Sequence, residues 1–257
     1  MNYKKTLAAV AITGLCSFVV ARLASKDKDL PAVCSCKSKC NKYEGLTVTA
    51  HTGCMDTAMN SLESIHAGVG NGADIVEFDL RYDQNNVAVL SHDDVTANAT
   101  PVTLEEAFAA VAEYDKLVIN IDVKDTTYLE QIQPLAEKYG LSERIFFTGI
   151  RFSDAKAAKE KCPLIPYYLN IDIVKPINTS SAYIKSVISR IEKSGAVGLN
   201  ARASRVSYKL VSAVKAAGYP VSLWTPSTSE EIRAALPLQA DNLTTRNPQL
   251  LCEIIGR

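Results

Sequence analysis

Short apolar runs rich in β-branched residues alternate with longer segments of helical periodicity from residue 46 to the end of the chain. Runs of three to seven such residues, separated by helical segments, are typical of βα units and a parallel sheet. The strands are predicted at residues 46–50, 75–80, 117–123, 145–148, 165–169, 197–200, 221–224 and 243–245.

Helical segments are predicted between nearly all of these strands. One begins at Thr103, where Thr103-Leu-Glu-Glu has the form of a capping box. The others are expected at residues 58–70, 128–139, 154–161, 181–193, 207–217 and 229–235, with a short one after Pro248. Residues 87–90 form a further strand-like run behind the turn residues Gln84-Asn85-Asn86, which indicates a hairpin.

Eight strands in βα alternation predict an α/β fold of the (β/α)₈ TIM barrel class, with a small hairpin insertion after the second strand. The alternative is a doubly wound open sheet. That fold commonly has a G-x-G-x-x-G phosphate loop after its first strand, where this chain has Gly53 alone.

The N-terminal region differs from the rest and gives three predicted parts. Residues 1–24 have basic Lys4-Lys5 before an uncharged apolar run and read as a signal peptide or an N-terminal anchor. Residues 25–45 read as a Cys-rich tether, and residues 46–257 as the barrel. We therefore expect an exported protein, secreted or anchored outside the cytoplasm, with membrane proximity through its N-terminus.

Charge and cysteine content narrow the class of protein. The 257 residues include 28 Lys plus Arg and 28 Asp plus Glu, so the net charge is zero and nucleic-acid binding is not expected. The oligomeric state stays open.

Six of the seven cysteines follow the apolar run. This arrangement favours disulfides or reduced thiols over a zinc site. These six are Cys34, Cys36, Cys40, Cys54, Cys162 and Cys252.

Reactive side chains gather where the predicted strands end, which is the face that carries the active site of a TIM barrel. The strand-end residues are His51 after the first strand, Glu77 and Asp79 on the second, Asp122 and Lys124 on the third and Trp224 on the seventh, with His92 after the hairpin. His66 lies inside a helix and reads as a surface or packing residue. Acidic residues at strand ends are often helix caps or surface ion pairs, but a set with inward phase on adjacent strands favours a site.

Three carboxylates in this set predict a metal site. Glu77 and Asp79 are two residues apart and share a strand face, and Asp122 adds a third oxygen ligand from the next strand. Oxygen ligands alone suit a hard divalent cation, Mg²⁺ or Ca²⁺. Lys124 shares the face of Asp122, and Arg81 that of Glu77, so both are predicted to contact a phosphate.

Two histidines beside a metal site point to phosphoryl chemistry. Histidine titrates near neutral pH, so His51 and His92 are predicted as general base and general acid. A cation polarises the phosphate and lowers the pKa of an attacking oxygen. A hydroxyl next to the phosphate, as in glycerol, could attack first and give a cyclic phosphate.

The order of these motifs resembles the glycerophosphodiester phosphodiesterase family. Ala50-His51-Thr52-Gly53, Asn60-Ser61, residues 72–79 and Ser91-His92-Asp93 are similar to the family's HRG, ENT, GAD…E-x-D and HD motifs. Residues 120–124 resemble its N-I-E-x-K strand, 221–225 its V-x-x-W-T strand and 241–248 its closing D-G-I-x-T-D…P element. The resemblance covers the whole predicted barrel.

The resemblance implies a divalent metal held by Glu77, Asp79 and Asp122, acid–base catalysis by His51 and His92, and Lys124 at the phosphate. It also implies a small-molecule glycerophosphodiester substrate, hydrolysed to glycerol 3-phosphate and an alcohol. We add Arg81 and Trp224 to the expected substrate-binding residues.

Three departures from the family's motifs leave other functions open. Thr52 stands in place of Arg and removes a bidentate phosphate contact, Met59 stands in place of Glu, and Asp122 is one methylene shorter than Glu. One alternative is an enzyme like phospholipase C or D that acts on intact lipids. Another is a barrel that binds phosphodiesters or polymers without turnover, although binding alone does not require two histidines.

Overall fold

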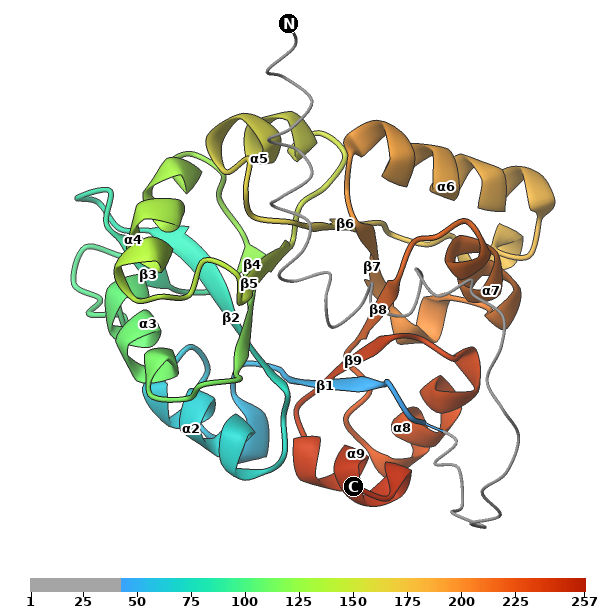
Figure 1. Cartoon of the computed structure of the whole chain (residues 1–257), viewed down its shortest axis with the longest axis horizontal. Coiled ribbons are helices and arrows are strands. Elements are labelled where there is room, and N and C mark those ends of the chain that lie inside the picture. The colour runs from blue at the N-terminus through green and yellow to red at the C-terminus, as the bar shows by residue number, and fades with distance from the viewer. Residues whose placement is uncertain (1–42) are drawn as a thin grey trace, which may run out of the picture. The chain divides into compact units, whose positions relative to one another are not determined.

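Eight parallel strands form a ring that is surrounded by helices (Figure 1) in the computed structural model of the chain, which describes residues 43–257. The strands are β1 (Thr47–Ala50), β2 (Ile75–Tyr82), β4 (Val118–Val123), β5 (Ile145–Thr148), β6 (Tyr168–Asn170), β7 (Gly198–Arg202), β8 (Val221–Trp224) and β9 (Asn242–Thr245). The predicted signal or anchor, and all but the end of the predicted tether, lie outside the described residues and stay predictions.

The order of the strands confirms the predicted barrel. They run β5-β4-β2-β1-β9-β8-β7-β6, and every neighbouring pair is parallel. A single parallel bridge between Phe147 and Tyr167 joins β5 to β6, so the ring is nearly closed. The predicted hairpin is confirmed too, because β3 (Ala88–Leu90) pairs antiparallel with the end of β2.

Helices follow the strands in the expected alternation. They are α2 (Leu62–Gly70), α3 (Leu104–Ala112), α4 (Ile132–Lys138), α5 (Ala155–Lys161), α6 (Ser181–Ser194), α7 (Tyr208–Ala216), α8 (Ser229–Ala235) and α9 (Pro248–Ile255). Short 3₁₀ turns lie at Cys54–Asp56, Leu129–Gln131, Lys175–Ile177, Ala203–Arg205 and Leu236–Leu238. The capping box at Thr103 is present: its hydroxyl accepts from the Glu106 amide, and the Glu106 carboxylate accepts from the Thr103 amide.

Several predicted elements begin later than expected; the helix predicted at residues 128–139, for example, is the 3₁₀ turn Leu129–Gln131 followed by α4. The helix predicted at residues 58–70 starts at Leu62, because Asn60 is left-handed (φ 57°) and Ser61 caps the helix by accepting from the amide of Ser64. The strand predicted at 165–169 starts at Tyr168. Pro166 has no N–H for a ladder, although its carbonyl accepts from the amide of Phe147.

The two faces of each strand have different partners. Gly68 of α2 packs against Ala50 and Val76, and a Cβ at position 68 would lie 2.7 Å from that of Ala50. Alternation along β1 and β2 therefore points Thr49 and Glu77 into the barrel. The interior is polar and hydrogen-bonded: Thr49 donates to Asn242 (2.8 Å), which donates to Ser222 (3.0 Å).

The cysteines of the described part are reduced, so the disulfide alternative is wrong for these three. Cys54, Cys162 and Cys252 are buried free thiols. Cys54 and Cys162 donate to backbone carbonyls of Ser64 (3.3 Å) and Leu129 (2.8 Å), and burial raises the pKa of all three. They are packing residues. Within residues 43–257, none of the helices has the length and apolar character needed to cross a membrane.

Candidate active site

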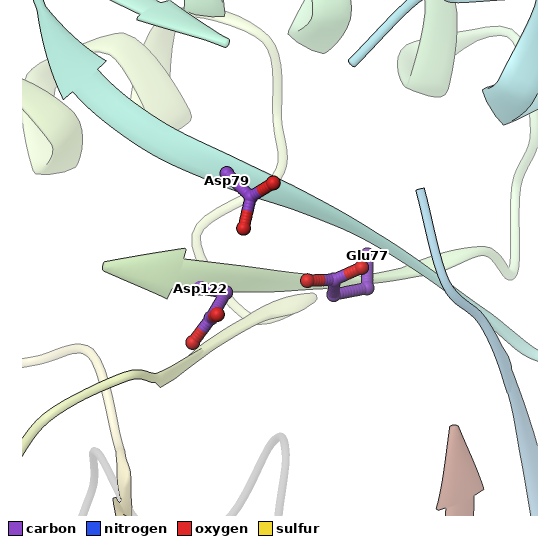
Figure 2. A group of neighbouring side chains, drawn as sticks. All are labelled: Glu77, Asp79 and Asp122. Atoms are coloured by element: carbon purple, nitrogen blue, oxygen red, sulfur yellow. The ribbon is translucent and has the colours of Figure 1, made fainter. Parts of the chain in front are cut away.

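Three carboxylates meet at the C-terminal ends of β2 and β4. Glu77, Asp79 and Asp122 each offer an oxygen, and these oxygens lie within 4.8 Å of one another. Figure 2 shows the three groups around a common space. The register explains the cluster, because Asp79 pairs with Asp122 across the parallel ladder, and Glu77 precedes Asp79 on the same face.

Burial makes this cluster electrostatically costly. The side chains of Glu77 and Asp79 are 5% and 2% exposed. Burial raises the pKa of Glu77 well above its ordinary value, and the charges of Asp79 and Asp122 raise it further. The amide of Thr52, which donates to Glu77 (2.9 Å), and the charge of Lys124 act in the opposite direction. The excess of negative charge fits a divalent cation, and all three ligand groups are hard oxygens.

Lys124 supplies positive charge beside the cluster. Its ammonium lies 2.6 Å from Asp122 and 3.0 Å from Asp79. Burial alone would lower the pKa of Lys124, but the two carboxylates outweigh burial and leave the pKa raised. The other oxygen of Asp122 accepts a hydrogen bond from Thr148 on β5 (3.1 Å). Asp122 is thus oriented from two sides.

Asn60 holds Asp79 in place from the loop before α2. Its side-chain amide donates to the Asp79 carboxylate (3.0 Å), and its side-chain oxygen accepts from the Asp79 backbone amide (3.0 Å). The hydroxyl of Thr52 accepts from the Asn60 backbone amide (2.5 Å). Thr52 is 1% exposed, so its hydroxyl orders this loop and is not free to contact a ligand.

His51 stands beside Glu77 at the end of β1. Its Nδ1 lies 2.7 Å from the carbonyl oxygen of Thr52 and 3.9 Å from Glu77. A carbonyl only accepts, so Nδ1 carries the hydrogen and Nε2 of the neutral ring is free to accept a proton. Burial lowers the pKa of His51, the Thr52 carbonyl raises it, and the charge of Arg246 lowers it again. The net lowering keeps the ring neutral near pH 7.

His92 is more open and lies on the loop after β3. Its side chain is 56% exposed, and its Nδ1 donates to the carboxylate of Asp93 (2.9 Å). Arg81 orients the same loop, because its guanidinium donates to the carbonyl of His92 (2.9 Å) and to Asp94 (2.5 Å). The predicted phosphate contact of Arg81 stays a prediction, and its observed contacts give it a positioning role.

A hollow of about 440 Å³ separates the His92 loop from the turn before α2. Its lining residues are Met59, Asn60, Leu90, Ser91, His92, Asp93, Thr100, Pro101 and Val102. Since Asn60 also binds Asp79, the hollow adjoins the carboxylate cluster. Its walls mix polar and apolar groups, as a pocket for a small polar molecule requires.

The other side of the barrel mouth is basic. Trp224 ends β8, and the guanidinium of Arg202, at the end of β7, lies 4.4 Å from the centre of its ring. Arg246 follows β9 directly and is exposed. Trp224 therefore stands between two arginines, opposite the acidic strands β2 and β4 in the strand order.

The segment that carries most of the predicted site residues matches a family model. The model described as the glycerophosphoryl diester phosphodiesterase family matches residues 50–135. Similarity to this family is therefore established for residues 50–135. The matched segment contains both predicted catalytic histidines, all three carboxylates and both Lys124 and Arg81, whereas Trp224 and Arg246 lie beyond it. The match confirms the resemblance seen in the sequence over this segment, while the catalytic and metal-binding roles of these residues stay predictions.

Solved structures share the fold. A glycerophosphodiester phosphodiesterase from Thermotoga maritima superposes with a TM-score of 0.64 at 21% identity, covering 81% of this chain and 98% of its own. An Oleispira antarctica phosphodiesterase in complex with the product sn-glycerol-3-phosphate gives 0.65 at 22% identity, with 82% and 97% covered. One from Parabacteroides distasonis gives 0.63 at 18%, with 82% and 97% covered. No curated protein matches this chain.

The structure brings most of the predicted site residues together and adds others. Glu77, Asp79, Asp122 and Lys124 are in contact, and His51 joins them at Glu77. His66 lies on the exposed side of α2, 2.7 Å from the hydroxyl of Tyr114, as a surface residue should. The sequence reasoning missed the roles of Thr148, Arg202 and Arg246. Their position at the ends of strands β5, β7 and β9 was the available signal for all three.

Proposed function

We propose that this chain hydrolyses glycerophosphodiesters to glycerol 3-phosphate and an alcohol, with a divalent cation bound by Glu77, Asp79 and Asp122. The observation that carries the proposal is the cluster of three carboxylates beside His51, two of them buried. Its position within the family match supports this reaction, and the Oleispira antarctica structure with the product sn-glycerol-3-phosphate supports the substrate class.

The cation would supply Lewis-acid polarisation of the phosphate. Either Mg²⁺ or Ca²⁺ is compatible with three carboxylate ligands. The chain's own residues hold this site in shape, since Asn60 fixes Asp79, the Thr52 amide fixes Glu77 and Thr148 fixes Asp122. Such supporting hydrogen bonds orient ligands and tune affinity.

His51 acts as the general base in this proposal. The neutral ring takes a proton at Nε2 from the glycerol hydroxyl next to the phosphate, and that oxygen attacks phosphorus. Its Nδ1–H stays on the carbonyl of Thr52, which fixes the ring and stabilises the positive charge that forms. The carboxylate of Glu77, 3.9 Å away, stabilises the same charge.

His92 acts as the general acid on the other side. Protonated at Nε2, it donates that proton to the leaving alkoxide as the bond between phosphorus and the alcohol oxygen breaks. The alcohol then leaves through the hollow that His92 lines. Water opens the resulting cyclic phosphate with the two histidines in reversed roles and gives glycerol 3-phosphate.

Product formation tests the proposal. The purified protein is incubated with glycerophosphocholine or glycerophosphoethanolamine, with Mg²⁺, Ca²⁺ or EDTA, and glycerol 3-phosphate is measured. We expect product with a cation and none with EDTA. Asp122→Asn is expected to need more cation for half-maximal activity. Glu137→Gln, on the exposed surface of α4, serves as the control variant.

The other candidate functions give different results in the same experiment. An enzyme that acts on intact lipids would release head group or phosphorylated head group from phosphatidylcholine vesicles and leave glycerophosphocholine intact. A barrel that only binds would retain glycerophosphocholine without turnover under every cation condition. Either result would refute the proposed reaction.

A further inference from the structure

The cationic side chains nearest the carboxylate cluster are already engaged. Lys124 forms ion pairs with Asp79 and Asp122, and Arg81 binds Asp94 and the carbonyl of His92. Thr52, the residue after His51, is neutral and buried. A phosphodiester carries a negative charge, and a guanidinium recognises it best because the two can form paired hydrogen bonds.

Arg246 has a free guanidinium at this mouth. Among the described residues, none forms a hydrogen bond or an ion pair with its side chain. Its backbone, in contrast, is fixed on both sides: its carbonyl accepts from the amide of Met55 (2.9 Å), and its amide donates to the hydroxyl of Ser227 (3.1 Å). The side chain is therefore exposed and unpaired on a well-anchored backbone.

The strand register brings Arg246 beside His51. Ala50 pairs with Thr245 across β1 and β9, and the amide of His51 donates to the carbonyl of Thr245 (2.8 Å). Arg246 is thus the next residue along β9 from the partner of Ala50. Neighbouring strands lie about 4.8 Å apart, so Arg246 and His51 are lateral neighbours.

Arg246 lies one residue beyond the end of β9, and continued alternation from that strand predicts that its side chain faces the mouth of the barrel. Asn242 faces the interior, where it is hydrogen-bonded to Thr49 and Ser222. Thr244 shares that face, and its hydroxyl accepts from the Asn242 amide (3.4 Å). Arg246 has the same parity. The influence of its charge on the pKa of His51 agrees with this direction.

We infer that Arg246 binds the substrate phosphate and supplies the guanidinium contact that Thr52 cannot make. Resting on the proposed function, this assigns a substrate-positioning residue outside the segment of the family match. The phosphate is then contacted from β9, which is separated from the carboxylate-bearing strand β2 by β1 alone. Arg202 is stacked on Trp224 and does not have this free geometry.

Binding of glycerol 3-phosphate, measured by calorimetry in the presence of Mg²⁺ or Ca²⁺, tests the inference without turnover. Arg246→Ala is expected to weaken binding by roughly 10- to 100-fold, as the loss of a charged hydrogen-bonding pair does. Arg246→Lys is expected to recover part of the affinity, because it keeps the charge but not the paired donors. Arg233→Ala, an exposed arginine on α8, is the matched control and should bind as wild type.

The kinetic readout adds a second test. The Arg246→Ala variant should raise KM for glycerophosphocholine more than it lowers kcat, since the contact exists in both ground and transition states. Product binding by Arg246→Ala equal to that of wild type would overturn the assignment, and so would a wild type that binds neither glycerol 3-phosphate nor inorganic phosphate. Binding without hydrolysis by wild type would refute the proposed reaction and leave the role of Arg246 supported.

Discussion

Replacing Glu77 by Gln separates the charge repulsion within the carboxylate cluster, which destabilises the fold, from the cation binding that the cluster provides. The variant removes one negative charge and keeps an oxygen that can accept from the amide of Thr52. Two unit charges at the 4.8 Å limit of the cluster repel by about 3.5 kcal/mol at an effective dielectric constant of about 20. Lys124 offsets part of this repulsion. We therefore expect Glu77→Gln to raise the free energy of unfolding by about 2 kcal/mol in EDTA.

Thermal and urea unfolding at neutral pH, with EDTA and then with Mg²⁺ or Ca²⁺, measure this effect. A gain of about 2 kcal/mol corresponds to roughly 4–8 °C in Tm for a domain of this size. Wild type should be stabilised by the cation, because a ligand that binds only the folded state shifts the equilibrium toward it. Glu77→Gln should lose most of that response. Glu253→Gln, on the exposed surface of α9, is the control and should match wild type.

The pH dependence of stability follows from the raised pKa of Glu77. The pKa of Glu77 is higher in the folded state than in the unfolded state, so the folded state binds the proton more tightly. Protonated Glu77 therefore stabilises the fold below its ordinary pKa of about 4.3. That stabilisation is lost as the pH rises through the raised value. In EDTA the stability of wild type should fall over this range, and that of Glu77→Gln should fall less. Equal pH profiles, or a variant that is less stable than wild type in EDTA, would refute the reasoning.

Three further outcomes are expected. Asn60→Ala removes both side-chain hydrogen bonds to Asp79 and should weaken cation binding by roughly 10-fold; unchanged affinity by calorimetry would show that Asn60 does not orient the ligand. His51→Ala should lower kcat by roughly 10²- to 10⁴-fold while cation binding persists, and activity near that of wild type would exclude it as the base. Gly149→Ala should lower the urea-measured unfolding free energy by about 2 kcal/mol or more, because its φ is +79° and a Cβ would lie 2.3 Å from the carbonyl oxygen of Val123. A stable Gly149→Ala variant would show that the backbone there can shift.

The architecture and the carboxylate cluster were predictable from the sequence. The alternation of strands and helices gave the barrel, and the inward parity of Glu77 and Asp79 placed them on one face. Both signals are local and periodic. The start of α2 was not predictable in the same way, because Asn60 takes a left-handed conformation that pattern reading does not detect. That conformation accompanies its two hydrogen bonds to Asp79, a contact across 19 residues.

Contacts between distant strands were the part that sequence reasoning could not supply. Arg246 is 195 positions from His51, and their adjacency depends on β9 pairing with β1 as the ring closes. The stacking of Arg202 on Trp224 likewise depends on the register of β7 and β8. The engagement of Arg81 with the His92 loop depends on how the hairpin folds back on β2. Each of these needs the three-dimensional register and not the pattern alone.

Cation-dependent release of glycerol 3-phosphate from glycerophosphocholine, compared between wild type and Asp122→Asn, tests the central claim most directly. The account predicts product from wild type that EDTA abolishes and added cation restores, and a higher cation requirement for Asp122→Asn. Product that is unaffected by EDTA, or the same cation requirement in both proteins, would contradict a catalytic cation held by these three carboxylates.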